Sequence, residues 1–373
     1  MPGERVDEDV RVSTIELFFD LVFVFTITQL TSLLVAEPTG VGLARVALIF
    51  GNVWWMYGGY AWLTNAVPPR ETVLRLLMLV GMGGFLVVAL AIPESFGESG
   101  IAFGIGYLVV TFVHTGLFLR SSEESAVRAM FRLGPFNTIT AALLLVAGFT
   151  SGSVQWALWA AAFVLHWASP AITAVGGFRI RAKHFVERHG LILLIALGES
   201  VIAVGIGVQG HDLSTGLAVT AVLGLALAAA LWWLYFDGED ERAELALDAA
   251  PDTRNPWLAL FAFGYAFLPL LGGIIVFAAG MKEAVVRYDE PASAATAWFL
   301  AGGVATYVVG LVAFRAVLRT GPLLGRLCIA AVAVPTVVIG LWVSPELQLA
   351  VLTIVVTAGI LVEAPRRQPS PAI

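Results

Sequence analysis

This 373-residue chain is 59% hydrophobic and only 13% charged, with a mean hydropathy of +0.88. Such a composition excludes an ordinary soluble globular domain and is typical of a chain whose segments lie in lipid. A net charge of −6 without a basic stripe gives no indication of nucleic-acid binding, and a single cysteine, Cys328, excludes an intramolecular disulfide.

Twelve apolar runs follow one another along the chain, each close to the ~20 residues that a helix needs to cross a bilayer. Because backbone groups inside lipid must be paired within their own segment, we expect an all-α, polytopic integral membrane protein. The first run lacks a basic leader and a cleavage site, so it is predicted to be a retained helix. The expected spans are 14–35, 43–64, 73–93, 100–119, 134–150, 154–175, 185–208, 213–236, 256–279, 295–315, 322–343 and 346–363.

Arginine and lysine are distributed asymmetrically between the two sides of this predicted bundle. Eighteen lie on the side of the N-terminus, and three (Arg45, Lys282 and Arg287) lie on the other side. Positive residues concentrate on the cytoplasmic side of membrane proteins. Both termini are therefore predicted to be cytoplasmic, in a multi-pass protein of the plasma (inner) membrane.

Two motifs indicate that the second half of the chain repeats the first. The sequence WWMY at 54–57, near the end of the second run, matches WWLY at 232–235, near the end of the eighth. A Gly-Pro pair at 134–135 opens the fifth run, and another at 321–322 opens the eleventh. Two parallel six-helix repeats are a familiar transporter architecture. The alternative is chance, together with the aromatic belts that membrane proteins carry at the interface.

The predicted organisation follows from these runs. A cytoplasmic N-terminal segment (1–13) precedes a first six-helix half (14–175) and a second six-helix half (176–363). A disordered cytoplasmic tail (364–373) ends the chain.

Two carboxylates stand near the start of the first predicted helix. Ser13 and Glu16 have the spacing of a helix capping box, which favours a structural role for Glu16. Asp20 lies one turn further along the same face, about 9 Å deeper than Thr14 at ~1.5 Å per residue. A carboxylate at that depth is either a proton or cation site or a structural hydrogen-bonding group.

Glu199 lies deep in the seventh run, close to the expected middle of the membrane. An isolated carboxyl group there is either protonated or paired, and both states suit proton or cation coupling. The structural alternative is a neutral glutamic acid that is hydrogen-bonded to a neighbouring helix.

Further polar residues accompany these carboxylates. Glu187, Arg188 and His189 open the seventh run, and Arg188 and His189 are candidates to pair with Asp20 or Glu16; a solvated helix entrance is the alternative. His114 and His166 lie within apolar runs as candidate proton relays, although a lone histidine is commonly a packing residue. Asn52, Gln29 and Asn137 are candidates for hydrogen bonds between helices.

Several chemistries find no support in the sequence. The histidines lack metal-ligand spacing, and there is no GxxxxGK[ST] loop, so no metal, cofactor or catalytic residue is predicted. The acidic stretch 238–241 (GEDE) is expected to be a solvated connection rather than a calcium loop.

Two stretches of the sequence resemble signatures of one family. The stretch 14–24 (TIELFFDLVFV), continuing to Gln29 and Leu30, is similar to the opening signature of the bacterial low-temperature-requirement A (LtrA) family. The stretch 187–191 (ERHGL), followed by LGES at 197–200, resembles its second signature. The resemblance implies a multi-spanning inner-membrane protein linked by name to growth in the cold, and it supplies no reaction.

The functional expectation is a proton- or cation-coupled secondary transporter whose site lies between the first and seventh helices, near Asp20 and Glu199. Alternatives are an ion channel, a membrane-embedded enzyme acting on lipids, and a scaffold or sensor without catalytic activity. The expected partners are the lipid bilayer and an unidentified small solute or cation. The oligomeric state stays open.

Overall fold

The computed structural model describes residues 12–69, 71–121, 123–173, 178, 180–209, 212 and 214–363, and within these residues it contains helices and no strand. Most of the predicted segments 1–13 and 364–373 lies outside this part of the chain. The first half consists of α1 (Thr14–Ala36), α2 (Gly40–Ala66), α3 (Thr72–Ala91) with the 3₁₀ turn η1 (Ile92–Glu94), α4 (Gly100–Phe118), α5 (Glu124–Ala147) and α6 (Gly152–Thr173).

The second half contains more interruptions than the first. Its helices are α7 (Ala182–Gly207), α8 (Thr215–Phe236), α9 (Glu239–Asp248), α10 (Asn255–Ala259), the π-helix η2 (Leu260–Tyr265), α11 (Phe267–Ala284), α12 (Ala294–Leu318), α13 (Leu324–Ala333), the 3₁₀ turn η3 (Val334–Thr336), α14 (Val337–Trp342) and α15 (Pro345–Glu363). The segments α10–η2–α11 and α13–η3–α14 each form one continuous passage.

Ten helical segments in the described part of the chain are long and apolar enough to cross a membrane. They are Thr14–Ala36, Thr72–Glu94, Gly100–Phe118, Glu124–Ala147, Ala182–Gly207, Thr215–Asp248, Asn255–Ala284, Ala294–Leu318, Leu324–Trp342 and Pro345–Glu363. The remaining two long helices, α2 and α6, have 27 and 22 residues, and neither contains a stretch apolar enough to be counted among these ten. The predicted all-α polytopic membrane fold is therefore confirmed.

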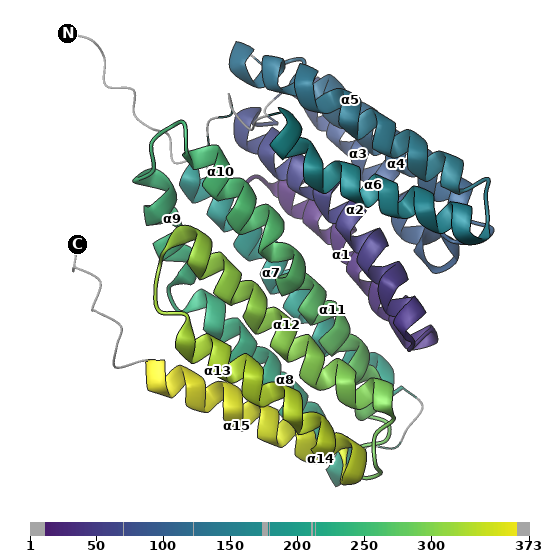
Figure 1. Cartoon of the computed structure of the whole chain (residues 1–373), viewed down its shortest axis with the longest axis vertical. Helices are drawn as coiled ribbons and strands as arrows, with labels where there is room; N and C mark the ends of the chain where they lie inside the picture. Colours follow the sequence, from purple (N-terminus) through teal and green to yellow (C-terminus); the bar gives the residue numbers. More distant parts are fainter. Residues whose placement is uncertain are drawn as a thin grey trace.

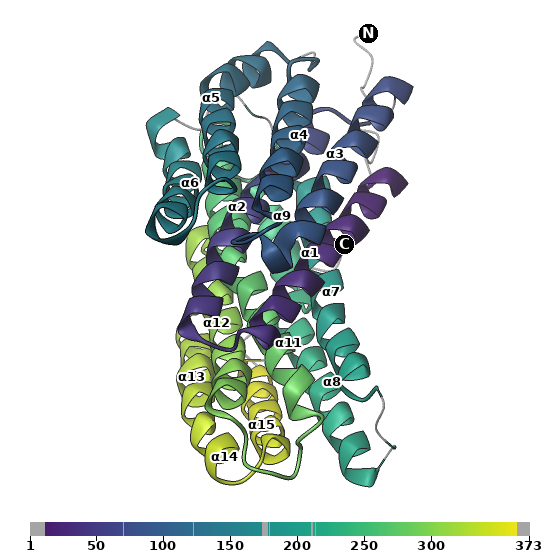
Figure 2. The same ribbon diagram turned by 90° about the vertical axis from the view of Figure 1, so that its right-hand side faces the viewer.

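The helices form two groups that meet along α1, α2, α7 and α11 (Figure 1). Within the first group α1 packs against α2 and α3, and α3, α4, α5 and α6 pack in sequence. Within the second, α7 packs against α8 and α11, and α11, α12, α13 and α15 pack in sequence. Figure 2 shows the same two groups from the side. This correspondence of neighbours is what the predicted repeat requires, and the repeat itself stays a prediction.

Glycines permit close helix contacts at matching places in the two groups. In α3 and α4, a Cβ added to Gly84 would lie 3.0 Å from the carbonyl oxygen of Gly106, and one added to Gly106 would lie 2.9 Å from that of Gly84. In α11 and α12, the corresponding distances between Gly273 and Gly303 are 2.6 and 2.8 Å. Backbones this close are typical of small-residue interfaces in membrane bundles.

The predicted start of the fifth helix is wrong. α5 begins at Glu124 rather than at residue 134, so Pro135 lies inside the helix, whereas Pro322 precedes α13. Charged residues lower the hydropathy of the first turns of α5, and membrane helices tolerate internal proline. The two Gly-Pro pairs therefore occupy different positions, and that sequence match does not support the repeat.

The acidic connection after α8 also differs from expectation. Gly238 adopts the left-handed backbone conformation (φ +92°), which glycine accommodates without strain, and starts α9 there. Glu239 is buried (1% exposed) rather than solvated. Arg242 is a local partner, but the buried partners Arg315 and Arg326 lie far away in the sequence, so local composition does not indicate the burial of Glu239.

Candidate functional site

A buried group of four charged or titratable side chains joins the starts of α1 and α7; we call it the α1–α7 ion cluster. It consists of Glu16 and Asp20 from α1 and His184 and Arg188 from α7, all at most 3% exposed. Each pair has i,i+4 spacing, which places both members on one helix face. Arg188 Nη1 lies 2.8 Å from Glu16 Oε1, Arg188 Nη2 lies 3.4 Å from Asp20 Oδ1, and His184 Nε2 lies 3.2 Å from Glu16 Oε1.

Residues of α1 and α2 surround the guanidinium of Arg188. It donates to Thr64 Oγ1 at 2.5 Å, and its carbon lies 5.4 and 5.8 Å from the ring centres of Phe19 and Tyr57. The Tyr57 hydroxyl donates to Asp20 Oδ1 at 2.9 Å. Two carboxylates thus face one arginine, and Asp20 Oδ2 has no hydrogen-bond partner among the described residues.

Glu16 combines the two roles considered for it. Its Oε2 accepts from the Ser13 amide at 2.9 Å and from the Ser13 hydroxyl at 2.7 Å, as at a capped helix start. Its Oε1 accepts from Arg188 at 2.8 Å. The predicted pairing between α1 and α7 is therefore confirmed for Arg188. His189, the residue after Arg188, instead has its Nδ1 2.8 Å from the carbonyl oxygen of Phe185.

Glu199 lies further along the same interface and contacts α1 through Thr28. Thr28 Oγ1 lies 2.6 Å from Glu199 Oε2 and 3.3 Å from the Val24 carbonyl oxygen. Glu199 is 1% exposed, and Lys282 of α11 is near enough to interact with it electrostatically. Because α7 begins at Ala182, Glu199 is roughly 26 Å from its start and roughly 12 Å from its end at ~1.5 Å per residue, off the expected centre.

These contacts show that α1 and α7 run parallel. Residues 16 and 20 meet 184 and 188, and Thr28, about two turns further on, meets Glu199. A parallel arrangement requires an even number of membrane crossings between the starts of the two helices, as the predicted six-helix halves provide.

The remaining candidates lie elsewhere. Glu187 is exposed and lines a surface hollow with Lys183 and Asp240. His166 Nδ1 lies 3.1 Å from Asn52 Oδ1, away from both carboxylates, and so confirms Asn52 as an interhelical hydrogen-bond partner. His114 lies between α2 and α4 near Gly59. The structure therefore brings Glu16, Asp20, Arg188 and Glu199 to one interface and leaves the other candidates, Glu187, His114, His166 and His189, outside these contacts.

Sequence reasoning missed His184, Tyr57, Thr64 and Thr28. Only His184 had a usable signal, because it precedes Arg188 by the same four residues that separate Glu16 from Asp20. The hydroxyl groups are too common in membrane helices to be distinguished without the fold.

A second buried group, which we call the second-half ion cluster, was also missed. It consists of Glu239, Arg315, Arg326 and Glu363, from α9, α12, α13 and α15. Arg326 Nη2 lies 3.3 Å from Glu239 Oε1, and its Nε lies 3.2 Å from Glu363 Oε2. Arg315 Nη2 lies 2.5 Å from Glu239 Oε1 and 3.1 Å from Glu363 Oε2. Two buried acids thus face two buried arginines, and the partly exposed Arg242 also pairs with Glu239, at 2.9 Å.

Among the residues that the structure describes, no group of three His, Cys, Asp or Glu side chains is arranged to hold a metal ion. The fold and the site define a polytopic helical membrane protein with a buried ion cluster between the leading helices of its two halves.

The comparison with known families places the chain more narrowly. It matches the family described as Bacterial low temperature requirement A protein (LtrA) over residues 11–361, and it belongs to that family. It is similar to an uncharacterized protein of Rhizobium meliloti (strain 1021), with 29% identity over 292 residues that cover 74% of this chain and 70% of the relative. No solved structure matches the chain.

Proposed function

We propose that this protein is a secondary transporter that couples the movement of a small solute to protons or another cation, with Glu199 as the coupling carboxyl group. The observation that carries the proposal is the contact of Thr28 with both Glu199 and Val24.

This contact suits both protonation states of the carboxyl group. A threonine hydroxyl has one proton to donate. When Glu199 is ionised, Thr28 donates to its Oε2; when Glu199 is protonated, the acid donates to Thr28 Oγ1, and Thr28 donates to the Val24 carbonyl. When Glu199 gains or loses its proton, the Thr28 hydroxyl group therefore needs only to rotate, and the helices can stay in place.

The α1–α7 ion cluster supplies the second part of the argument. Its two carboxylates carry one negative charge more than Arg188 balances, unless His184 or a carboxyl group holds a proton. Charges inside a membrane protein are costly, and they mark ion and proton pathways in pumps and transporters. The interface of two parallel repeats is also where transporters place coupling sites. On the predicted orientation, in the inner membrane with cytoplasmic termini, this cluster lies toward the cytoplasm and Glu199 lies beyond it.

Proton flux in proteoliposomes tests the proposal. Purified protein is reconstituted with a trapped pH-sensitive dye, and flux is followed under an imposed potential with a panel of cation gradients. We expect flux in the wild type and at least a tenfold loss in Glu199→Gln. The matched control is Glu124→Gln, because the Glu124 side chain is 87% exposed on α5.

Wild-type flux retained in a folded Glu199→Gln protein would overturn the role of Glu199. The absence of flux under every gradient would overturn the transporter proposal itself. Unitary currents in a planar bilayer would show that the protein is an ion channel rather than a transporter.

A further inference from the structure

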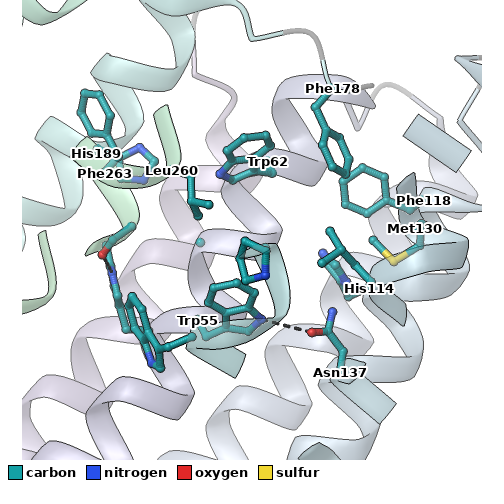
Figure 3. Close-up of a pocket in the computed structure, with 17 residues that line it drawn as sticks. Trp55, Trp62, His114, Phe118, Met130, Asn137, Phe178, His189, Leu260 and Phe263 are labelled. Atoms are coloured by element: carbon teal, nitrogen blue, oxygen red, sulfur yellow. Dashed lines mark hydrogen bonds between the residues drawn. The ribbon is translucent and has the colours of Figure 1, made fainter. Parts of the chain in front are cut away.

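A cavity of about 80 Å³ lies where the two halves meet, beside the α1–α7 interface. Both halves line it, with α2, α4, α5 and α6 on one side and α7 and η2 on the other. Figure 3 shows His189 and Phe263 on one side of the cavity and Phe118 and His114 on the other, with Trp55 and Asn137 in the lower part of the view. Trp55 Nε1 donates to Asn137 Oδ1 at 3.1 Å.

Two lining residues carry buried nitrogen atoms without a hydrogen-bond partner among the described residues. They are Trp167, at Nε1, and His114, one of whose ring nitrogens interacts with the backbone of Gly59 and leaves the other without a partner. His114 is 2% exposed. A neutral imidazole offers one donor and one acceptor, and an indole offers one donor. Buried polar groups are normally paired, so these atoms indicate an occupant that both donates and accepts hydrogen bonds.

The lining excludes a charged occupant. The residues that line the cavity include no aspartate, glutamate, lysine or arginine. An unpaired charge would lose its hydration there without compensation.

The size of the cavity limits the occupant further. Its volume is about half of the ~150 Å³ that holds a benzene molecule in a protein interior, which corresponds to roughly three to five heavy atoms. We propose that this cavity is a binding site for a small neutral solute with an amide or hydroxyl group, whose polar atoms pair with His114 and Trp167 and whose apolar part contacts the tryptophan rings.

This inference does not depend on transport, because such a site would equally serve a sensor or an enzyme. Its test is therefore a binding measurement, which can fail or succeed without regard to proton flux.

Acrylamide is a suitable probe, since it is a neutral primary amide of five heavy atoms and quenches tryptophan fluorescence on contact. The static part of the quenching, which leaves the fluorescence lifetime unchanged, reports a bound complex. We expect a saturable static component in the wild-type protein that acetamide displaces. Iodide and caesium ions, which quench and carry charge, should give none.

Two glycines allow a matched pair of variants. A Cβ at Gly58, which lines the cavity, meets nothing within 4 Å, and the same holds for Gly83, which is exposed on α3. Gly58→Leu should fill the cavity and abolish the static component, while Gly83→Leu should retain it. His114→Phe keeps the ring and removes both nitrogens, and it should weaken acrylamide binding about fivefold, the loss of one hydrogen bond.

A static component that is absent from the wild type, or unchanged in Gly58→Leu, would overturn the site. Saturable quenching by iodide or caesium that acetamide displaces would overturn the neutral class of occupant.

Discussion

Arg188 of α7 donates to Glu16 of α1 at 2.8 Å, with both side chains buried, so the first helices of the two halves are joined by an ion pair. The guanidinium also lies 3.4 Å from Asp20, which makes one arginine the common partner of both acids.

Loss of Arg188 should therefore destabilise the protein strongly. Arg188→Ala leaves two buried carboxylates without their cation, at a cost of about 3–5 kcal/mol. We expect a large fall in thermal stability in detergent, measured by loss of monodisperse protein on heating. Arg128→Ala is the control, because the Arg128 side chain is 69% exposed in an i,i+4 pair worth only about 0.3–0.5 kcal/mol. Equal stability of the two variants would contradict a dominant role for the cluster.

Replacement of Thr28 should alter Glu199 with little effect on folding. Thr28→Val keeps the shape and removes the hydroxyl, at a cost of about 0.6 kcal/mol, up to about 1.7, for an interhelical hydrogen bond in a membrane. In the protonated state Glu199 then loses its acceptor, so its carbonyl stretch should move to higher frequency in the infrared spectrum. Thr28→Ser, which keeps the hydroxyl, should retain the wild-type band. An unshifted band in Thr28→Val would show that this hydrogen bond is not made.

The second-half ion cluster should contribute to stability in a way that neighbouring acids do not. Glu239→Ala leaves Arg315 and Arg326 sharing only Glu363, and we expect a loss of about 3–5 kcal/mol. Glu241 lies two residues away on the exposed face of α9, and Glu241→Ala should change the free energy of unfolding by no more than about 0.5 kcal/mol. Thermal unfolding of both variants makes the comparison. A Glu239→Ala protein as stable as the wild type would show that the cluster does not stabilise the fold.

Two adjacent glycines of α12 should respond oppositely to alanine. At Gly303 a Cβ would lie 2.5 Å from the backbone nitrogen of Phe277, so Gly303→Ala must push α11 and α12 apart, at about 1–3 kcal/mol. At Gly302 a Cβ meets nothing within 4 Å, and alanine should be neutral or stabilising by up to about 1 kcal/mol from helix propensity. The same unfolding assay applies, and two equal losses would contradict the close contact between these helices.

Much of the fold was predictable because its signals are local. Apolar runs of membrane length mark the helices, since the bilayer requires that length wherever a helix crosses. The start of α5 was not predictable in this way, because hydropathy marks only the part of a helix that lies in lipid. A helix can extend beyond the lipid as a polar segment. Glu124 to Leu133 are helical although they are too polar to belong to an apolar run.

The candidate site was predictable only in part, for a related reason. Rare charges such as Asp20 and Glu199 attract notice against an apolar background, and their cost makes a partner necessary. The identity of the partner depends on which helices touch. Glu239 and Arg326 are 87 residues apart and pair only because the fold brings their side chains to within 3.3 Å, and nothing in the sequence around either residue indicates the other.

The pairing of α1 with α7 also constrains how the protein is made. Glu16 and Arg188 are separated by 172 residues, so at ~5–20 residues per second the carboxylates of α1 are synthesised roughly ten to thirty seconds before their cation. During that interval the first half must carry Glu16 and Asp20 protonated, hydrated, or held outside the lipid by the insertion machinery. Charge neutralisation is thus a late event in biogenesis, and a chain truncated before α7 should be a substrate for membrane quality control.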